Sequence, residues 1–376
     1  PVLNDVLAQP GAAFLAEFLQ PSALRRLVAR EVPDPEMLSR FVTRGGERTA
    51  IRLVPRGLVC HWLAGNVPLL GALSWAVSVL VGNANLLRLS SQQDDFISPL
   101  LEALAGSGDS GETLASETSV VRFDRGDVAA HRAMSGAADV RIAWGGRESV
   151  EVVKSLPARW DCEDVILGPR ISFAVVDPTT MTAGATRRLA TDVVYFDQQA
   201  CSSPQIVFVR RRADDAEFAR FVSELSEEIA RKSVAVPRRP LDHGETYRIA
   251  LDRSRVLLAG GSVRRDDGTS WTVAVLAEPA PDVRCANRFV QVVPFGTFDD
   301  VLRHIPPNVQ TIVTRLPAKD LETFTDAACV RGVCRFPAPG EGNRFETPWD
   351  GLPLVSRLTR WVTRTESAFE TGDGLR

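Results

Sequence analysis

Short apolar runs of strand length alternate with longer amphipathic or wholly apolar segments through the first half of the chain. The short runs predict strands at 51–54, 58–63, 85–88, 119–123 and 140–143. The longer segments predict helices at 69–80, 95–105 and 147–155. Strands and helices in alternation are typical of a mostly parallel sheet covered by helices, so the pattern predicts a doubly wound α/β fold.

A second series of strand-like runs follows, at 171–177, 205–210, 271–277, 289–293 and 309–314. Its clearest helix is predicted at 214–231, where apolar residues recur on one face: Phe218, Phe221, Leu225 and Ile229. Two such series predict two domains, 1–169 and 170–355, with the boundary near Pro169. Residues 356–376 are then expected to form a C-terminal tail.

The stretch from Trp62 to Val81 contains no charged residue and has about the length needed to cross a bilayer. Its start contains Gly65 and Pro68, which interrupt a helix. Only 69–80 is left for a helix that is apolar all round, and such a helix is buried. We therefore expect a core helix and no membrane span.

Composition suits a large enzyme with two hydrophobic cores, since the 376 residues are 44% hydrophobic and 24% charged. A net charge of −3 gives no electrostatic footprint for nucleic acid. The six cysteines are scattered without the paired spacing of a zinc site, so we expect free thiols, no metal and a cytoplasmic protein. No signal peptide is evident, although the chain starts at Pro1, which leaves the native amino terminus open.

Residues 106–111 read GSGDSG and fit a dinucleotide-binding fingerprint letter for letter. That fingerprint needs a strand before it and a helix after it, whereas here a predicted helix precedes it and the predicted strand 119–123 follows. The letters GDSG within it also match the nucleophile loop of trypsin-like proteases, whose two β-barrels do not fit an α/β pattern. We discount both motifs.

The strongest candidate for chemistry is the polar loop at 197–204, which reads DQQACSSP. It lies between two runs that read as strands, 191–195 and 205–209. A loop of small residues with free backbone N–H groups can expose Cys201 and favour its thiolate, which is the nucleophilic form. The alternative is a buried structural cysteine, the commoner fate of this residue type.

Upstream segments complete a wider pattern, with HWLAGNVPL at 61–69 and GNANLLRLSS at 82–91. Together with the cysteine loop, and in this order, they resemble the aldehyde dehydrogenase superfamily. With PWDG at 348–351, the chain is most similar to the fatty acid (acyl thioester) reductases of bacterial bioluminescence operons. The resemblance covers roughly 50–362 and implies a Rossmann-like cofactor domain followed by an α/β catalytic domain.

The resemblance implies a dinucleotide site without the usual triple-glycine fingerprint. The expected cofactor-binding residues are Leu63, Arg88, Ser90, Ser91, Gly126, Gly145, Gly146, Arg147, Leu167 and Gly168. Relatives that prefer NAD have a glutamate near Ser91, where it binds the ribose hydroxyls. Serine there, with Arg88 beside it, favours the 2′-phosphate of NADPH. The alternatives are a surface arginine among ordinary serines, and at Arg147 a solvated helix-start residue.

The implied reaction begins when Cys201 attacks a thioester of CoA or of an acyl-carrier protein. The Asn66 side chain and the backbone N–H of Cys201 are the candidate oxyanion donors, although Asn66 also suits a turn. Hydride from NADPH then reduces the acyl-cysteine to the aldehyde. The glutamate of aldehyde-oxidising relatives has no counterpart at 165–170, where only Glu163 and Asp164 lie nearby. The later glutamate motif, which touches the nicotinamide ribose in relatives, is also altered, to RCAN at 284–287.

Other functions stay open at this point. An acyl-phosphate reductase of the glutamyl-phosphate type shares the fold, the cysteine and the missing base. A cysteine acyltransferase or hydrolase would need one of the histidines, His61, His131, His243 or His304, beside Cys201. A non-catalytic scaffold is a fourth class. The resemblance also implies an acyl-activating synthetase as partner, and a homo-oligomer to which 354–362 contributes.

Overall fold

The computed structural model describes residues 12–45, 48–65, 69–90, 95–212, 216–283 and 286–365. The chain forms two compact units. The first contains the described residues up to Gly168 together with those from Phe345 onward, and the second runs from Pro169 to Arg344. The segment 345–365 therefore belongs to the first unit, whereas the sequence interpretation assigned it to the second domain and to a separate tail.

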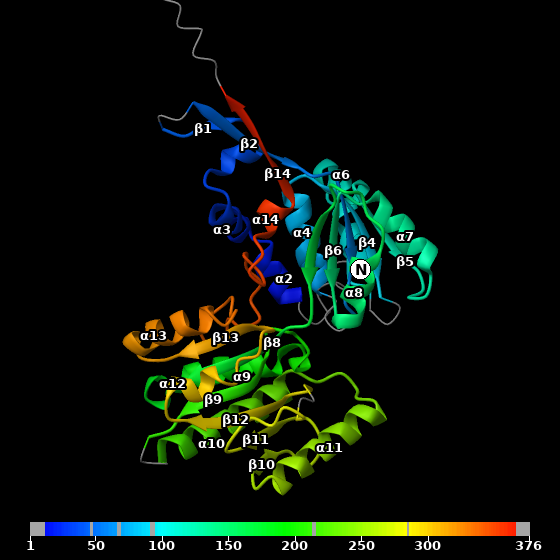
Figure 1. Cartoon of the computed structure of the whole chain (residues 1–376). Helices are drawn as coiled ribbons and strands as arrows, with labels where there is room; N and C mark the ends of the chain where they lie inside the picture. Colours follow the sequence, from blue (N-terminus) through cyan, green and yellow to red (C-terminus); the bar gives the residue numbers. More distant parts are fainter. Residues whose placement is uncertain are drawn as a thin grey trace, which may run out of the picture. The chain divides into compact units, whose positions relative to one another are not determined.

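The first unit is built on a five-stranded parallel sheet in the order β5-β4-β3-β6-β7. Its strands are β3 (Leu58–Trp62), β4 (Ala84–Leu89), β5 (Thr118–Arg122), β6 (Val140–Trp144) and β7 (Glu163–Leu167). The chain adds β4 and β5 on one side of β3, then returns to add β6 and β7 on the other (Figure 1). In doubly wound sheets ligands bind at such a switch point, outside the carboxyl ends of the strands.

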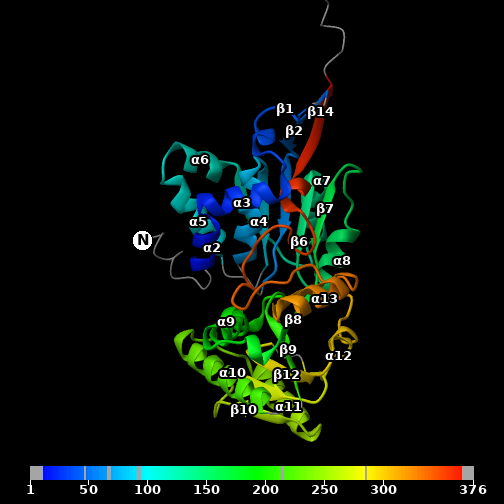
Figure 2. The same ribbon diagram turned by 90° about the vertical axis from the view of Figure 1, so that its left-hand side faces the viewer.

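Helices cover both faces of this sheet, with α4, α5 and α6 on one side and α7 and α8 on the other (Figure 2). Their bounds are α4 (Leu69–Leu80), α5 (Ile97–Ala105), α6 (Asp109–Ser116), α7 (Val128–Ala137) and α8 (Arg147–Ser155). The predicted bounds of α4 and α8 are confirmed. Among the described residues, no helix combines the length and apolar character that crossing a membrane requires.

The discounted motif at 106–111 joins two helices, because α5 ends at Ala105 and α6 starts at Asp109. The sequence interpretation missed α6 but correctly placed a helix before the motif. Its last glycine has a packing reason: a Cβ on Gly111 would lie 2.0 Å from the carbonyl oxygen of Leu104. Glycine here lets α6 approach the end of α5.

A small antiparallel sheet, β1-β2-β14, completes the first unit. It consists of β1 (Val42–Thr43), β2 (Thr49–Pro55) and β14 (Thr359–Thr365). The short helices of this part are α2 (Ala12–Phe18), α3 (Pro21–Glu31), η1 (Pro35–Leu38) and α14 (Leu354–Arg357). The end of the described chain thus pairs in register with β2 near its start, Thr359 opposite Pro55.

The second unit is built on a six-stranded sheet in the order β10-β11-β12-β9-β8-β13, in which only the β10–β11 pair is antiparallel. Its strands are β8 (Ile171–Val176), β9 (Pro204–Arg210), β10 (Ser262–Arg265), β11 (Thr272–Val275), β12 (Phe289–Phe295) and β13 (Val309–Arg315). Its helices are η2 (Pro178–Thr180), α9 (Ala183–Val194), η3 (Tyr195–Gln198), α10 (Ala216–Ala235), α11 (His243–Leu258), α12 (Phe298–Leu302) and α13 (Ala318–Cys329).

Alternate residues of each central strand of this sheet face two different cores, as the two-residue strand period requires. In β9, Ile206 and Phe208 join the core under α11, α12 and α13, while Val207 and Val209 join the core under α9 and α10. All four side chains are buried. A parallel sheet covered on both faces needs such a continuous apolar run.

The expected strand at 191–195 is wrong, because these residues form the last turn of α9 and the start of η3. Leu189, Val193 and Val194 are fully buried against the sheet at helical spacing. The β-branched run reads as a strand by propensity, but packing of this helical face overrides it.

Candidate active site

Cys201 lies in the short loop between η3 and β9, at the amino end of the central strand β9. Its side chain is partly exposed, and the residue is a thiol. The loop backbone is fixed because the carbonyl oxygen of Cys201 accepts a hydrogen bond of 2.6 Å from the hydroxyl of Ser172. Ser172 is fully buried near the start of the neighbouring strand β8.

The two serines after the cysteine are buried and face Asn343. Their hydroxyls donate to Oδ1 of Asn343, at 2.7 Å from Ser202 and 3.2 Å from Ser203. The amide of Asn343 in turn donates to the backbone oxygen of Asp192 in α9, at 3.0 Å. The downstream half of the cysteine loop is therefore tied to a segment 141 residues away in sequence.

Asp192 holds the segment that carries Asn343. Its carboxyl oxygens accept hydrogen bonds from the backbone N–H groups of Gly340, at 2.6 Å, and Gly342, at 3.0 Å. A Cβ on Gly342 would come within 3.2 Å of this carboxyl, so glycine permits the close approach. Burial raises the pKa of Asp192 to about 7, because it opposes the charged form more strongly than the backbone donors favour it.

This raised pKa predicts a pH dependence of stability. The folded pKa lies above the unfolded one, so the contribution of Asp192 is fully present below about pH 4 and is lost as the pH rises through about 7. We expect the Asp192→Asn variant, which does not titrate, to show a flatter dependence of unfolding free energy on pH between 4 and 8. Urea titrations of both proteins across this range measure it. Identical pH profiles would contradict the prediction.

Two glutamine side chains hydrogen-bond to backbone carbonyl oxygens at the two ends of the cysteine loop. Gln198 is buried and donates to the carbonyl oxygen of Pro204 at 2.7 Å, spanning the cysteine. Gln205 donates back to the carbonyl oxygen of Gln198 at 3.2 Å. The loop that exposes Cys201 is thus held at several backbone positions, which supports a displayed nucleophile over a structural thiol.

The expected cofactor residues lie in the first unit, at the carboxyl ends of its parallel strands. Leu63 follows β3, is buried, and donates its N–H to the carbonyl oxygen of Arg88 at 3.2 Å. Ser90 follows β4, and its carbonyl oxygen accepts from Arg122 at 2.9 Å. A Cβ on Gly65 would lie 3.2 Å from the Ser90 hydroxyl, so the turns after β3 and β4 are adjacent. Ser91 lies outside the described residues.

Arg88 occupies the penultimate position of β4 and is buried, which does not fit the alternative of a surface arginine. The residue is only 8% exposed. Its Nη2 donates to the carbonyl oxygen of Phe123 at 3.1 Å, and its guanidinium lies 5.4 Å from the centre of the Phe123 ring. The buried Nε has no hydrogen-bond partner within the described ranges. Burial also lowers the pKa of this guanidinium.

The glycines occupy the turns after β5 and β6. Gly126 donates its N–H to the Asp124 carboxylate at 2.7 Å. Gly145 has a φ of +155° and bonds through its N–H to the carbonyl oxygen of Leu167 at 3.3 Å, which joins the turns after β6 and β7. Gly146 is the N-cap of α8, where no side chain caps the first N–H groups and an added Cβ would meet open space.

Arg147 and Gly168 are the remaining described residues of the expected cofactor site. Arg147 is exposed, with Nε 3.9 Å from the Glu151 carboxylate, as the solvated alternative also requires. Gly168 packs near Val150 of α8, 3.7 Å from where its Cβ would lie. The structure thus brings the described members of the expected set to one edge of one sheet.

Other acid and base candidates are engaged elsewhere. Glu163 forms ion pairs with Arg56 at 3.2 Å and Arg357 at 2.6 Å, and Asp164 pairs with Arg141 at 2.6 Å. Glu163 and Asp164 are the first two residues of β7, at its amino end, whereas the expected cofactor residues lie at the carboxyl ends of the strands. These pairs give no support to either carboxylate as the base of a hydrolytic reaction.

Three of the four histidines are engaged with partners other than Cys201, so they give no support to a hydrolase. His61 is buried between Ser74 and Asn85, and burial lowers its pKa to about 4. His131 accepts from Trp62, and His304 faces Glu278. Within the described ranges, no group of three or more metal-ligating side chains gathers.

Besides Ser91, two more expected positions fall outside the described residues, namely Asn66 and the start of the altered 284–287 motif. Sequence reasoning also missed the residues that hold the cysteine loop, Ser172, Asp192 and Asn343. The paired serines after Cys201 were the only local signal, because buried hydroxyls need partners. Their partner is too distant in sequence to be found by spacing.

Known proteins similar to this chain include curated relatives and solved structures. A long-chain acyl-protein thioester reductase of Aliivibrio fischeri is 26% identical over 365 residues, which cover 96% of this chain and 74% of that protein. Aldehyde dehydrogenase 21 of Physcomitrella patens matches with a TM-score of 0.69 and 14% identity, covering 98% of this chain and 82% of that one. An NADP-dependent glyceraldehyde-3-phosphate dehydrogenase of Bacillus halodurans, solved with NADP, matches with a TM-score of 0.69 and 16% identity, covering 96% and 82%.

The solved structures show that the fold is that of the aldehyde dehydrogenases. The acyl-CoA reductase (LuxC) family model matches residues 4–361, which is nearly the whole chain. This protein belongs to the acyl-CoA reductase (LuxC) family.

Proposed function

We propose that the protein reduces an acyl thioester, carried on CoA or on an acyl-carrier protein, to the aldehyde, with NADPH as reductant and Cys201 as covalent nucleophile. The observation that carries the proposal is the cysteine loop: Cys201 is partly exposed at the amino end of β9 while Ser172 and Asn343 fix the backbone around it. A nucleophile must be both accessible and held in place for attack.

The first step transfers the acyl group. The sulfur of Cys201 forms a bond to the thioester carbonyl carbon, the carbon–sulfur bond to the carrier breaks, and the departing thiol takes up the proton that Cys201 loses. The backbone N–H of Cys201 and the amide of Asn66 would stabilise the oxyanion of the tetrahedral intermediate. The resulting acyl-cysteine is a thioester of nearly the same energy as the substrate.

The second step converts the acyl-cysteine to the aldehyde. The nicotinamide cofactor, when bound, supplies the hydride for this reduction. Cys201 leaves the thiohemiacetal carbon as its thiolate and regains a proton, which restores the enzyme. Hydrolysis of the acyl-cysteine would compete with reduction. Glu163 and Asp164 lie nearest in sequence to the position of the catalytic glutamate in aldehyde-oxidising relatives. Both form ion pairs with arginines, so they are poorly placed to activate water.

The turns at the carboxyl edge of the first sheet fit a dinucleotide. Gly146 leaves open space at the uncapped start of α8, where N–H groups favour a phosphate. The buried Nε–H of Arg88 has no hydrogen-bond partner among the described residues, so it can donate to an anionic group beside Ser90. We assign Leu63, Gly126, Gly145, Arg147, Leu167, Gly168 and Ser91 to the same site.

The substrate and partners complete the proposal. The relative from Aliivibrio fischeri is named for long-chain acyl-protein thioesters, which supports a fatty acyl group. An acyl-activating synthetase would supply that group, and the protein would act as a homo-oligomer in the cytoplasm. The test is a panel of acyl-CoA esters, acyl-carrier proteins and acyl phosphates, with aldehyde formation and NADPH oxidation measured together. Turnover of acyl phosphates alone would contradict the thioester assignment.

NADPH is expected to bind more tightly than NADH, and Arg88→Met to erase the preference. Methionine has a similar length but removes the guanidinium, which lies 5.4 Å from the centre of the Phe123 ring. Losing a charged hydrogen bond costs about 1.5–3 kcal/mol, or roughly 10- to 150-fold in affinity for the phosphorylated cofactor. Fluorescence titration of both cofactors measures the ratio. Arg159→Met, which removes an exposed arginine paired with Asp161 in the loop before β7, is the matched control. A ratio that Arg88→Met leaves unchanged would remove Arg88 from the site.

A further inference from the structure

Two left-handed turns of non-glycine residues lie beside the cysteine loop. The first is Phe196, Asp197 and Gln198, with φ of 54°, 52° and 60°. The second is Ala286, Asn287 and Arg288, with φ of 46°, 53° and 63°. Residues with a Cβ rarely adopt this region, and runs of three are rarer still because each residue adds strain. Such turns persist only where surrounding contacts hold them.

Side chains of the two turns bind each other. Arg288 donates from Nε at 3.0 Å and from Nη2 at 2.7 Å to one carboxylate oxygen of Asp197. The amide of Gln199 donates to Oδ1 of Asn287 at 2.8 Å. Arg288 is 1% exposed and the Asp197 side chain 13%, so this ion pair is largely shielded from water. We name the Asp197–Arg288 pair the clamp.

Neighbouring groups complete the hydrogen bonding of the clamp. The backbone N–H of Arg239 donates to the second oxygen of Asp197 at 3.3 Å. Arg239 also pairs with Glu245 in the first turn of α11. Glu245 also accepts a hydrogen bond from the side-chain amide of Asn287, at 3.4 Å, and Asn287 belongs to the second left-handed turn. The ring of contacts thus ties both turns to the start of a helix.

We infer that Asp197 and Arg288 are positioning residues for Cys201: the buried clamp holds the left-handed turn from which the cysteine loop starts. Ser172 and Asn343 fix the loop at and after the cysteine, and Gln198 bridges its two ends. The clamp adds the contact that holds the left-handed turn containing Gln198. Without the clamp the strained turn relaxes toward ordinary φ values, and the backbone at Gln198, three residues before Cys201, moves. The inference rests on the proposed function, because positioning matters only if Cys201 is the nucleophile.

The test measures the reactivity of Cys201 itself. Wild type, Asp197→Asn, Arg288→Met and the double variant are treated with iodoacetamide, and alkylation of the Cys201 peptide is followed by mass spectrometry. In parallel, acyl transfer from an acyl-CoA is timed in a single turnover. A misplacement of about 1 Å can slow a reaction about 10²-fold, so we expect acyl transfer to fall by that order in each single variant. The double variant should fall no further, because either change alone opens the clamp.

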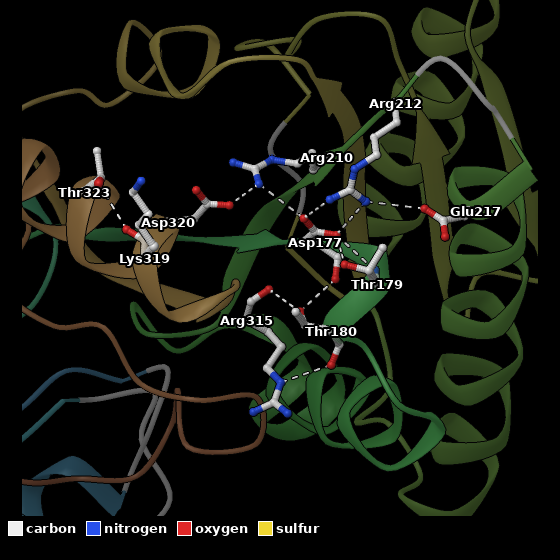
Figure 3. Close-up of polar contacts among 10 residues, drawn as sticks. All are labelled: Asp177, Thr179, Thr180, Arg210, Arg212, Glu217, Arg315, Lys319, Asp320 and Thr323. Atoms are coloured by element: carbon white, nitrogen blue, oxygen red, sulfur yellow. Dashed lines mark hydrogen bonds and ion pairs between the residues drawn. The ribbon is translucent and has the colours of Figure 1, made fainter.

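A matched control breaks a comparable buried network in the same unit. Asp177 is fully buried just after β8, where Arg210 and Arg212 converge on its carboxylate at 3.3 and 2.8 Å (Figure 3). It lies five residues from Ser172 along an extended strand, or roughly 16 Å from the end that holds the cysteine loop. Asp177→Asn should lower the unfolding temperature while leaving alkylation and acyl transfer at Cys201 within about twofold of wild type, because distant sites act independently.

Two milder variants keep the test decisive if Arg288→Met does not fold. Arg288→Lys retains the charge without the two-pronged geometry, and Gln199→Leu removes the hydrogen bond to Asn287 while leaving the ion pair in place. We expect Arg288→Lys to transfer the acyl group faster than Arg288→Met does. Gln199→Leu should lower the acyl-transfer rate about tenfold, which corresponds to about 1.4 kcal/mol.

The outcomes separate the clamp from the proposed function. If folded clamp variants alkylate and acylate Cys201 at the wild-type rate, the inference is wrong. It is equally wrong if Asp177→Asn slows acyl transfer as much as Arg288→Met, because the effect would then be general loosening of the unit. Alkylation by iodoacetamide requires neither substrate nor cofactor, so a change there supports the clamp even if the protein proves not to reduce thioesters.

Discussion

Cys201→Ala is expected to abolish aldehyde formation from acyl thioesters while leaving NADPH affinity within about twofold of wild type. The thiol is required for covalent capture of the acyl group, and loss of a nucleophile typically costs on the order of 10⁴-fold or more in turnover. The expected cofactor residues lie in the other unit, so removing the thiol leaves them unchanged. Aldehyde formation is followed by gas chromatography, and NADPH binding by fluorescence.

The matched control for this variant is Cys329→Ala. Cys329 is an exposed thiol at the end of α13 in the same unit. It should retain full activity, which shows that replacing a thiol by itself does not inactivate the protein. Aldehyde production by Cys201→Ala at a tenth of the wild-type rate would exclude a covalent mechanism through this residue.

Asn66→Ala is expected to lower turnover about 10²-fold, by analogy with other deletions of one oxyanion donor. The effect should fall on the rate of acyl transfer and leave NADPH affinity nearly unchanged, because the amide donates to charge that develops only during attack. Asn66→Asp removes the donor while keeping the shape, and should be at least as slow. Stopped-flow acyl transfer measures both. Normal rates in folded variants would make Asn66 a turn residue.

Much of the α/β architecture follows from local patterning. In the sequence, Pro68 precedes the apolar run 69–80 and Gly82 follows it, and the helix bounds predicted from this pattern are confirmed. Central strands of the two larger sheets, such as β6 and β9, are buried, mostly apolar runs and were predicted, whereas the edge strands β7 and β10, which carry charged residues, were missed. The segment 191–195 was misread because helical packing, not propensity, decides its structure.

The candidate site, like the fold, could be predicted from the sequence only in part. The cysteine loop was expected from its run of small polar residues, and the glycine turns were expected from the superfamily resemblance. The contacts that fix the loop could not be predicted, since Ser202 and Asn343 are 141 residues apart and Asp197 and Arg288 are 91 apart. Arg288 reads as a surface residue in sequence, yet it is almost fully buried. Only the fold brings its partner within reach.

The most direct test of the proposed mechanism is intact-mass measurement of the protein mixed with an acyl-CoA, before and after NADPH is added. We expect one acyl group per chain, located at Cys201 by peptide mapping and removed by hydroxylamine as a thioester is. Addition of NADPH should discharge it with release of one equivalent of aldehyde. Aldehyde formed without any acyl-protein, or an acyl group that maps to another residue and is discharged by NADPH, would contradict the mechanism.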